Sequence, residues 1–227
     1  MPVCQILNMG RAGYDSALDT QKNLLAEKIN GDETDYLILV EHDPVVTMGR
    51  RGTSSDLRRG HEDLRRRGIL LRDTGRGGAA TYHGPGQLVG YPIVDLTKHG
   101  RDVHRYLRRL ESCIIDALSN MDIAAERNPG RTGVWTDGAK IASIGIAVRR
   151  WITYHGFAVN VGDDLSGFEA IIPCGRDDCR MASVSSLLGR TVTVDEFAGV
   201  LVPEFGKEFG YKMEEKPAHL AETSAQV

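Results

Sequence analysis

A glycine-rich stretch from Asp73 to Leu96 is the feature that most constrains this chain. It reads DTGRGGAATYHGPGQLVGYPIVDL, and its glycines are interleaved with Arg76, Thr81 and His83. Glycine loses more backbone freedom on folding than any other residue, so this density indicates sharp turns or close backbone contacts. Apolar runs on both sides predict flanking strands. We interpret the stretch as the lining of a site rather than two exposed hairpin turns, because arginine and histidine are unusual turn residues.

Length and charge narrow the class of protein. The chain has 227 residues and a formal net charge of −3. This length predicts one sizeable domain, and the charge argues against general nucleic-acid binding. No apolar run approaches the roughly 20 residues needed to cross a bilayer, and the opening residues lack the pattern of a signal peptide. We therefore expect a cytoplasmic protein that binds neither nucleic acid nor membrane.

The cysteines predict a reduced, metal-free protein. There are four, Cys4, Cys113, Cys174 and Cys179. In a cytosolic protein they are expected to be free thiols. The spacing of Cys174 and Cys179 is not a usual zinc spacing, and no second pair lies nearby, so we expect no metal site.

The chain alternates between predicted strands and helices, which indicates a single α/β domain over residues 1–211. Helices are expected at 14–29, 61–67, 103–121 and 193–209, with a helical turn at 163–171. Strands are expected at 3–8, 36–41, 45–48, 69–71, 88–94, 123–126, 133–136, 139–148 and 152–161. The best helix, 103–121, has one apolar face. Residues 212–227 are polar and are expected to fray.

Two further residues raise chemical questions. Cys174 lies between a proline and a glycine, where a bend in the backbone can present the thiol. The commonest fate of a free cysteine is burial as a small apolar residue, and position alone favours that interpretation. Lys140 stands at the start of an otherwise apolar strand, and the alternative is a surface lysine at a strand end.

A thiol, an amine and a polar pocket together would suit covalent acyl transfer. A free thiol has a pKa of about 8.5 and is a poor nucleophile until a cation or base stabilises its thiolate. His83 is a third candidate group. A lone histidine is usually structural, but His83 lies among glycines, which offer its ring few side chains to pack against. The sequence alone does not bring these groups together in space.

Several segments resemble those of the lipoyl(octanoyl) transferases and occur in that family's order over about residues 42–187. They are HDPVVTMGR at 42–50, RGGAATYHGPGQL at 76–88, GYPIVDL at 90–96, KIASIG at 140–145, HGFAVN at 155–160 and PCG at 173–175. The resemblance implies a mixed β-sheet flanked by helices, the fold of the lipoate and biotin protein ligases. The ligase-like core would span about residues 31–211, and residues 212–227 would form a polar tail.

The resemblance also implies an activity. The family transfers an octanoyl group from octanoyl-acyl carrier protein to a lysine amine of lipoyl domains, through a cysteine acyl-thioester, in endogenous lipoate synthesis. The acceptors would be the lipoyl domains of 2-oxoacid dehydrogenase E2 subunits and the glycine cleavage H protein. No cofactor is expected, and the chain has no GxxxxGK[ST] phosphate loop.

Residue roles are carried over by position. Cys174 would be the nucleophile, and Lys140 would lower its pKa and move the proton. The substrate pocket would be lined by Arg76, Gly77, Gly78, Ala79, Ala80, Thr81, Tyr82, His83, Ser143, Ile144, Gly145, Gly156, Phe157 and Ala158. Backbone amides of the glycine-rich region, or those that follow Cys174, are expected to hold the oxyanion. Residues 176–180 are more charged than an acyl pocket would favour; we interpret them as a surface loop, and Cys179 remains the second candidate nucleophile.

Two other classes of function remain open. An ATP-dependent lipoate or biotin protein ligase would share the scaffold but would have no use for a thiol nucleophile, so Cys174 distinguishes the two. A non-catalytic scaffold that binds a lipoyl domain or acyl carrier is disfavoured by the cysteine, lysine and histidine together.

Arginine pairs and a triplet precede the glycine-rich stretch, at 50–51, 58–59 and 65–67. Charge runs are usually solvated surface. These arginines, however, flank the proposed site and outnumber the acidic residues that lie between them in the chain. We therefore predict that they form a docking surface for an acidic acyl carrier protein.

Overall fold

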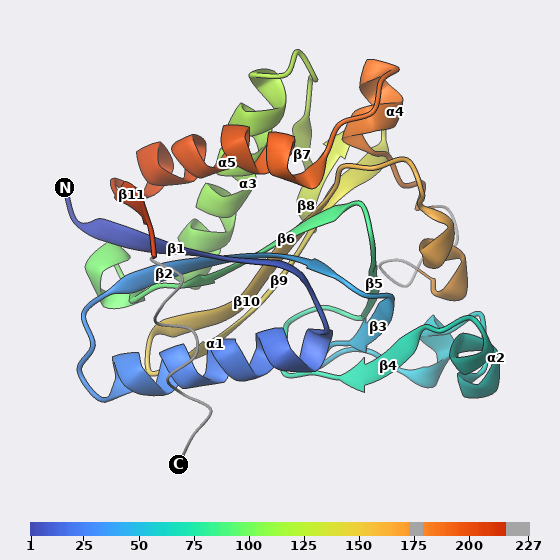
Figure 1. The fold of residues 1–227 in the computed structure, drawn as a ribbon, viewed down its shortest axis with the longest axis horizontal. Helices are drawn as coiled ribbons and strands as arrows, with labels where there is room; N and C mark the ends of the chain where they lie inside the picture. The colour runs from blue at the N-terminus through green and yellow to red at the C-terminus, as the bar shows by residue number, and fades with distance from the viewer. Residues whose placement is uncertain (173–178, 217–227) are drawn as a thin grey trace.

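The computed structural model describes residues 1–172 and 179–216. Its centre is a mixed eight-stranded sheet in the order β11-β1-β2-β6-β10-β9-β8-β7 (Figure 1). The strands are β1 (Val3–Ala12), β2 (Asp35–His42), β6 (Gln87–Ile93), β7 (Glu126–Asn128), β8 (Arg131–Thr136), β9 (Ala139–Arg149), β10 (Ile152–Asn160) and β11 (Lys212–Glu215). β1 pairs in parallel with β2 and β11, and the other neighbours are antiparallel.

Helices cover both faces of this sheet. In Figure 1, α1 (Tyr14–Ile29) lies along one face, and α3 (Val103–Ser119) and α5 (Val194–Phe209) lie on the other. The larger apolar core packs beneath α3 and α5 and includes Leu110 and Phe205, whereas the smaller one packs beneath α1 and includes Leu24 and Ile38. A short helix, α4 (Val184–Leu188), precedes α5. The mixed sheet flanked by helices agrees with the fold expected from the sequence.

A second sheet has three strands and stands at one end of the molecule (Figure 1). Its order is β4-β3-β5, with β3 (Val45–Met48), β4 (Leu70–Asp73) and β5 (Ala80–His83). It packs against α2 (His61–Arg66) and the 3-10 turn η3 (Ser166–Ala170); the other such turns are η1 (Ser54–Asp56) and η2 (Leu96–His99). The glycine-rich stretch includes β5 of this small sheet and continues into β6 of the large sheet. Because it connects the two sheets, the stretch faces the large sheet.

Local sequence explains several boundaries. Thr193 caps α5, because its side chain accepts a hydrogen bond from the Glu196 amide at 3.1 Å. Asp102 caps α3 by the same kind of bond, from the Arg105 amide at 2.9 Å. Between β9 and β10 the two turn residues, Arg150 and Trp151, have φ of 51° and 67°. Positive φ at both positions gives the turn the twist that a two-residue hairpin requires.

The end of the described chain differs from the expectation of fraying. Lys212–Glu215 form β11, which adds to the edge of the sheet in register with β1, Val3 opposite Lys212. Backbone hydrogen bonds hold this polar strand, so it leaves little apolar signal in the sequence. It follows Tyr211, whose buried hydroxyl donates to Asp35 at 2.7 Å. Residues 217–227 lie outside the described residues. Within the described residues, no helix combines the length and apolarity needed to span a membrane.

Candidate functional site

A cavity of about 950 Å³ lies where the glycine-rich stretch meets β9 and β10. Of the residues predicted for the site, those that line it are Arg76, Gly77, Gly78, Ala79, Ala80, Thr81, His83, Lys140, Ser143, Ile144, Gly145, Gly156, Phe157 and Ala158. Tyr82 instead packs its ring against Phe168, at 5.6 Å between centroids. The residues on either side of it, Thr81 and His83, line the cavity because side chains alternate along a strand. Cys174 lies outside the described residues.

Arg76 organises the glycine-rich stretch from within. Its buried guanidinium donates to the hydroxyl and carbonyl oxygens of Thr47 and, at 3.0 Å, to the Gly77 carbonyl. These partners are neutral, and burial lowers the pKa of Arg76 to about 10. It is therefore a buried cation at physiological pH, held by oxygen dipoles. We infer that much of its role is to fix the loop, since most of its donors are occupied.

The loop lies unusually close to the large sheet at Gly145. A Cβ atom there would come within 2.7 Å of the Gly77 carbonyl. The Gly77 amide also donates to the Ile146 carbonyl at 2.8 Å. A side chain at position 145 would push the loop off the strand, so this glycine is required by close approach.

Lys140 is buried and held from two sides. It is only 5% exposed, so the alternative of a surface lysine at a strand end is wrong. Its ammonium lies 5.0 Å from the ring centroid of Trp135 on β8. A Cβ at Gly133 would come within 2.8 Å of the Lys140 Cε, so that glycine leaves room for the lysine stem. The Gly133 amide donates in turn to the buried carboxylate of Glu111 on α3, at 3.1 Å.

The backbone of Lys140 anchors the described chain that resumes after the PCG segment, at residue 179. Its amide donates to the Arg180 carbonyl at 2.8 Å, and its carbonyl accepts from the Ala182 amide at 3.0 Å. On the other side of that segment, the Ile172 amide donates to the Asp56 carbonyl at 2.7 Å. Lys140 and Asp56 both line the cavity. The described residues that flank Cys174 are therefore tied to the cavity wall.

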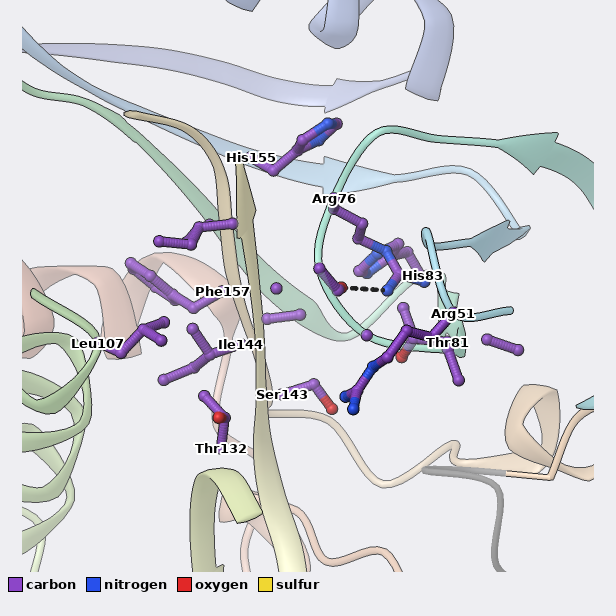
Figure 2. Close-up of a pocket in the computed structure, with 18 of the residues that line it drawn as sticks. Arg51, Arg76, Thr81, His83, Leu107, Thr132, Ser143, Ile144, His155 and Phe157 are labelled. Carbon is purple, nitrogen blue, oxygen red and sulfur yellow. Dashed lines mark hydrogen bonds between the residues drawn. The ribbon is translucent and has the colours of Figure 1, made fainter. Parts of the chain in front are cut away.

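His83 is a neutral base with an assignable tautomer. The Gln87 amide nitrogen donates to the Tyr82 carbonyl at 3.1 Å, which leaves its oxygen to accept from His83 Nδ1, also at 3.1 Å. The proton is thus assigned to Nδ1, and Nε2 carries a lone pair. Burial, with the neighbouring His42 and Arg76, lowers the pKa of His83 well below its usual 6.5. In Figure 2 its ring lies on the same side of the strands as Arg76 and Thr81.

Two other histidines surround the site. His42 Nδ1 donates to the Ala12 carbonyl at 3.0 Å, and its Nε2 accepts from the Tyr91 hydroxyl at 2.7 Å. His155 lines the cavity, and burial and nearby arginines lower its pKa to about 4. Both are therefore neutral at physiological pH, and the site carries its positive charge on arginine and lysine.

The described cysteines differ in their fitness as nucleophiles. Cys4 and Cys113 are fully buried, and burial raises the pKa of each thiol well above its ordinary value. A raised pKa leaves almost no thiolate at neutral pH, so both are poor nucleophiles. Cys179 is half-buried.

Sequence reasoning missed several lining residues. Val103 and Leu107 belong to the apolar face of α3, which predicts core packing, but both also line the cavity. Tyr14 lines it from the first turn of α1, ahead of the segments that carry the family resemblance. In Figure 2, Leu107, Ile144 and Phe157 lie on one side of the strands, and Arg51, Thr81 and His83 lie on the other. The cavity therefore has an apolar part beside α3 and a polar part beside the small sheet.

Among the described residues, no three or more His, Cys, Asp or Glu side chains are grouped as metal ligands. The polar part offers arginines, a buried lysine, neutral imidazole and loop backbone.

Comparison with known proteins adds relatives over nearly the whole chain. The Lipoyl protein ligase A/B catalytic domain matches residues 13–206. An octanoyltransferase of Geobacter metallireducens is 47% identical over 191 residues, 84% of this chain and 86% of that protein. An octanoyltransferase of Solibacter usitatus is 45% identical over 210 residues, 92% of this chain and 94% of that protein.

Solved structures share the fold at low sequence identity. A lipoate-protein ligase A bound with ATP has a TM-score of 0.76 and 18% identity, covering 96% of this chain and 90% of that one. A bi-partite lipoate protein ligase from Thermoplasma acidophilum has a TM-score of 0.73 and 20% identity, covering 95% and 87%. At these identities the likeness concerns the fold alone.

Proposed function

Because the chain belongs to the Lipoyl protein ligase A/B catalytic domain family, and is 42–47% identical to several octanoyltransferases, we propose that its cavity carries out octanoyl transfer through Cys174. The protein is an acyltransferase of lipoate biosynthesis, with an acyl donor and lipoyl-domain acceptors. The proposal adds the donor, octanoyl-acyl carrier protein, and two acceptors, the E2 subunits of 2-oxoacid dehydrogenases and the glycine cleavage H protein. It places the reaction in the cytoplasm and in one catalytic domain over residues 1–211, with the core at 31–211.

The first half-reaction is a thioester exchange. The Cys174 thiolate attacks the octanoyl carbonyl, the bond to the carrier sulfur breaks, and the carrier thiolate takes up the proton that Cys174 gave to Lys140. One thioester replaces another, so the step is nearly balanced in free energy. The buried position of Lys140 on the cavity wall is the observation that supports this most directly.

The second half-reaction forms an amide. The acceptor lysine, as a neutral amine, attacks the Cys174 thioester; the C–S bond breaks and the proton released from nitrogen returns to the thiolate. An amide is more stable than a thioester, which draws the reaction forward. The loop around Gly78, fixed by Arg76, is the proposed holder of the oxyanion in both steps.

One experiment tests the function and its nucleophile together. The protein is mixed with octanoyl-acyl carrier protein without ATP, and its intact mass is measured before and after a lipoyl domain is added. We expect an octanoyl adduct that disappears as the acceptor gains the same mass. Cys174→Ser should form no adduct, while Cys4→Ser, Cys113→Ser and Cys179→Ser should form it normally. Peptide mapping that placed the group on Cys179 would overturn the assignment, and activity only with ATP and free octanoate would favour a ligase.

A further inference from the structure

The wall of the cavity carries an excess of positive charge. Its described lining residues include four arginines and one lysine, but only one carboxylate, Asp56. That carboxylate already accepts a hydrogen bond from the Thr53 amide at 2.8 Å. The chain as a whole has a net charge of −3, so the positive charge is concentrated at the site. A wall of this kind favours a substrate that carries an anionic group.

Of the four arginines among the described lining residues, Arg50 and Arg51 are exposed and adjacent on one turn, whereas Arg131 on β8 is half-buried and Arg76 is buried. Neither the Arg50 nor the Arg51 guanidinium makes an ion pair or side-chain hydrogen bond with another described residue. In Arg76, by contrast, most of the side-chain donors are occupied. Arg58, which is also exposed, donates from Nε to the Ile171 carbonyl at 3.0 Å. Arg51 extends into the cavity in Figure 2. Arg50 is close enough for its charge to help lower the pKa of His155.

The backbone beneath these two side chains is fixed. The Arg50 amide donates to the Arg76 carbonyl at 2.9 Å, and the Arg51 amide donates to the Gly78 carbonyl at 3.0 Å. The turn closes with a bond of 2.8 Å from the Gly52 amide to the Gly49 carbonyl. A turn bonded to the glycine-rich loop therefore presents two unpaired guanidinium groups at the polar part of the cavity. Guanidinium groups match phosphate oxygens in geometry and bind them through charge-assisted bonds.

From this arrangement we propose that Arg50 and Arg51 bind the phosphate ester of a phosphopantetheine arm. The inference rests on the proposed transferase function, because acyl thioesters held by carrier proteins and by coenzyme A both hang from this arm. The octanoyl chain has an apolar part of the cavity available beside α3, and the phosphate has the arginines at the polar part. The donor is then recognised at both ends of its arm.

The test compares two donors that differ only in that phosphate. S-octanoyl-4′-phosphopantetheine and S-octanoyl-pantetheine carry no carrier protein, so protein docking cannot contribute. We expect the wild-type protein to prefer the phosphorylated donor about tenfold in kcat/KM, by one charge-assisted contact. The preference should vanish in Arg50→Gln/Arg51→Gln and survive in part in Arg50→Lys/Arg51→Lys. The matched control is Arg149→Gln, an exposed arginine at the β9–β10 hairpin, which should keep the full preference.

A binding measurement separates this inference from the catalytic proposal. Titration calorimetry with the free thiols 4′-phosphopantetheine and pantetheine requires no turnover. Tighter binding of the phosphorylated thiol, lost in the glutamine variant, supports the phosphate site even if no thioester reacts. Equal binding or equal kcat/KM of the two compounds by the wild-type protein would overturn it. Octanoyl-coenzyme A and octanoyl-acyl carrier protein are then compared to identify which molecule supplies the arm. If the glutamine variant reacts more slowly than the wild type with at least one of these donors, the phosphate contact is supported. If it reacts at the wild-type rate with both donors, the contact is contradicted.

Discussion

The ammonium of Lys140 lies 5.0 Å from the ring centroid of Trp135, on the neighbouring strand β8. Both side chains are buried. An aromatic face attracts a cation by its quadrupole, and more strongly when water is excluded. Trp135 thus holds the Lys140 ammonium at the cavity wall, and this is the group proposed to stabilise the Cys174 thiolate.

Removing this ring should weaken the activation of Cys174. A desolvated cation–π contact contributes about 1 kcal/mol or more, so Trp135→Leu should slow alkylation of Cys174 by iodoacetamide at pH 7 by about fivefold, whereas Trp135→Phe should slow it less. The control is Trp151→Leu, which alters an exposed tryptophan at the β9–β10 hairpin. Equal rates in Trp135→Leu and Trp151→Leu, with both proteins folded, would show that the ring has no such role.

Lys140 itself should set the pH dependence of that alkylation. A neighbouring cation lowers a thiol pKa from about 8.5 to near or below neutrality. Lys140→Ala should therefore slow the reaction at neutral pH, and the rate should recover as pH rises and the thiol ionises unaided. The profile is measured from pH 5 to 10 by loss of free thiol. An unchanged profile would assign the activation to another group, with His83 the first candidate.

The apolar part of the cavity should select a medium-length acyl chain. Burial of a methylene contributes about 0.8 kcal/mol, so each two-carbon shortening should lower transfer efficiency about tenfold. Leu107 lines this part from α3, and Leu107→Phe should shift the preference towards hexanoyl donors. Competition between donors of different length, read by the mass of the product, measures the shift. Equal transfer of acetyl and octanoyl groups would contradict an apolar chain site.

The arginines in and beside α2 are predicted to guide the carrier protein rather than the acyl group. Arg59, Arg66 and Arg67 all lie within 3.7 Å of the Asp63 carboxylate, so one acid balances three of them only in part. Reversing the charge at Arg65–Arg67 should lower kcat/KM for octanoyl-acyl carrier protein, most at low salt, because complementary charge mainly raises the association rate. Turnover of S-octanoyl-pantetheine should be unaffected. If both donors lose rate equally, these arginines are structural.

The neutral histidines should make the fold sensitive to acid. The pKa of His155 is about 4 in the folded protein, against 6.5 ordinarily. Between these values the unfolded chain binds a proton that the folded one does not, so the free energy of unfolding falls as pH drops from 6.5 to 4. His155 alone should account for up to about 3 kcal/mol. Urea unfolding at pH 7 and pH 4.5 should show a smaller loss in His155→Asn than in the wild type. His104→Gln, at an exposed histidine of α3, is the control; an equal loss in all three proteins would exclude His155.

Much of the fold could be predicted because its signals are local. The helix expected at 14–29 has those bounds in α1, and the helix expected at 193–209 is α5, which Thr193 caps through the Glu196 amide. The burial of Lys140 could not be predicted in this way. It depends on Trp135, on the missing side chain of Gly133 and on a glutamate in α3, and only the folded chain brings these together. Arg76 was predicted as a pocket residue from its motif, but its bonds to Thr47 depend on the pairing of β3 with β5.

The pairing of β11 with β1 has a consequence during synthesis. Lys212 is translated more than two hundred residues after its partner Val3. Until β11 is made, one edge of β1 therefore stays open, with backbone groups free to pair with another chain. The pairing of β11 with β1 closes that edge, so the nascent chain is exposed to this route of aggregation until residues 212–215 have been added.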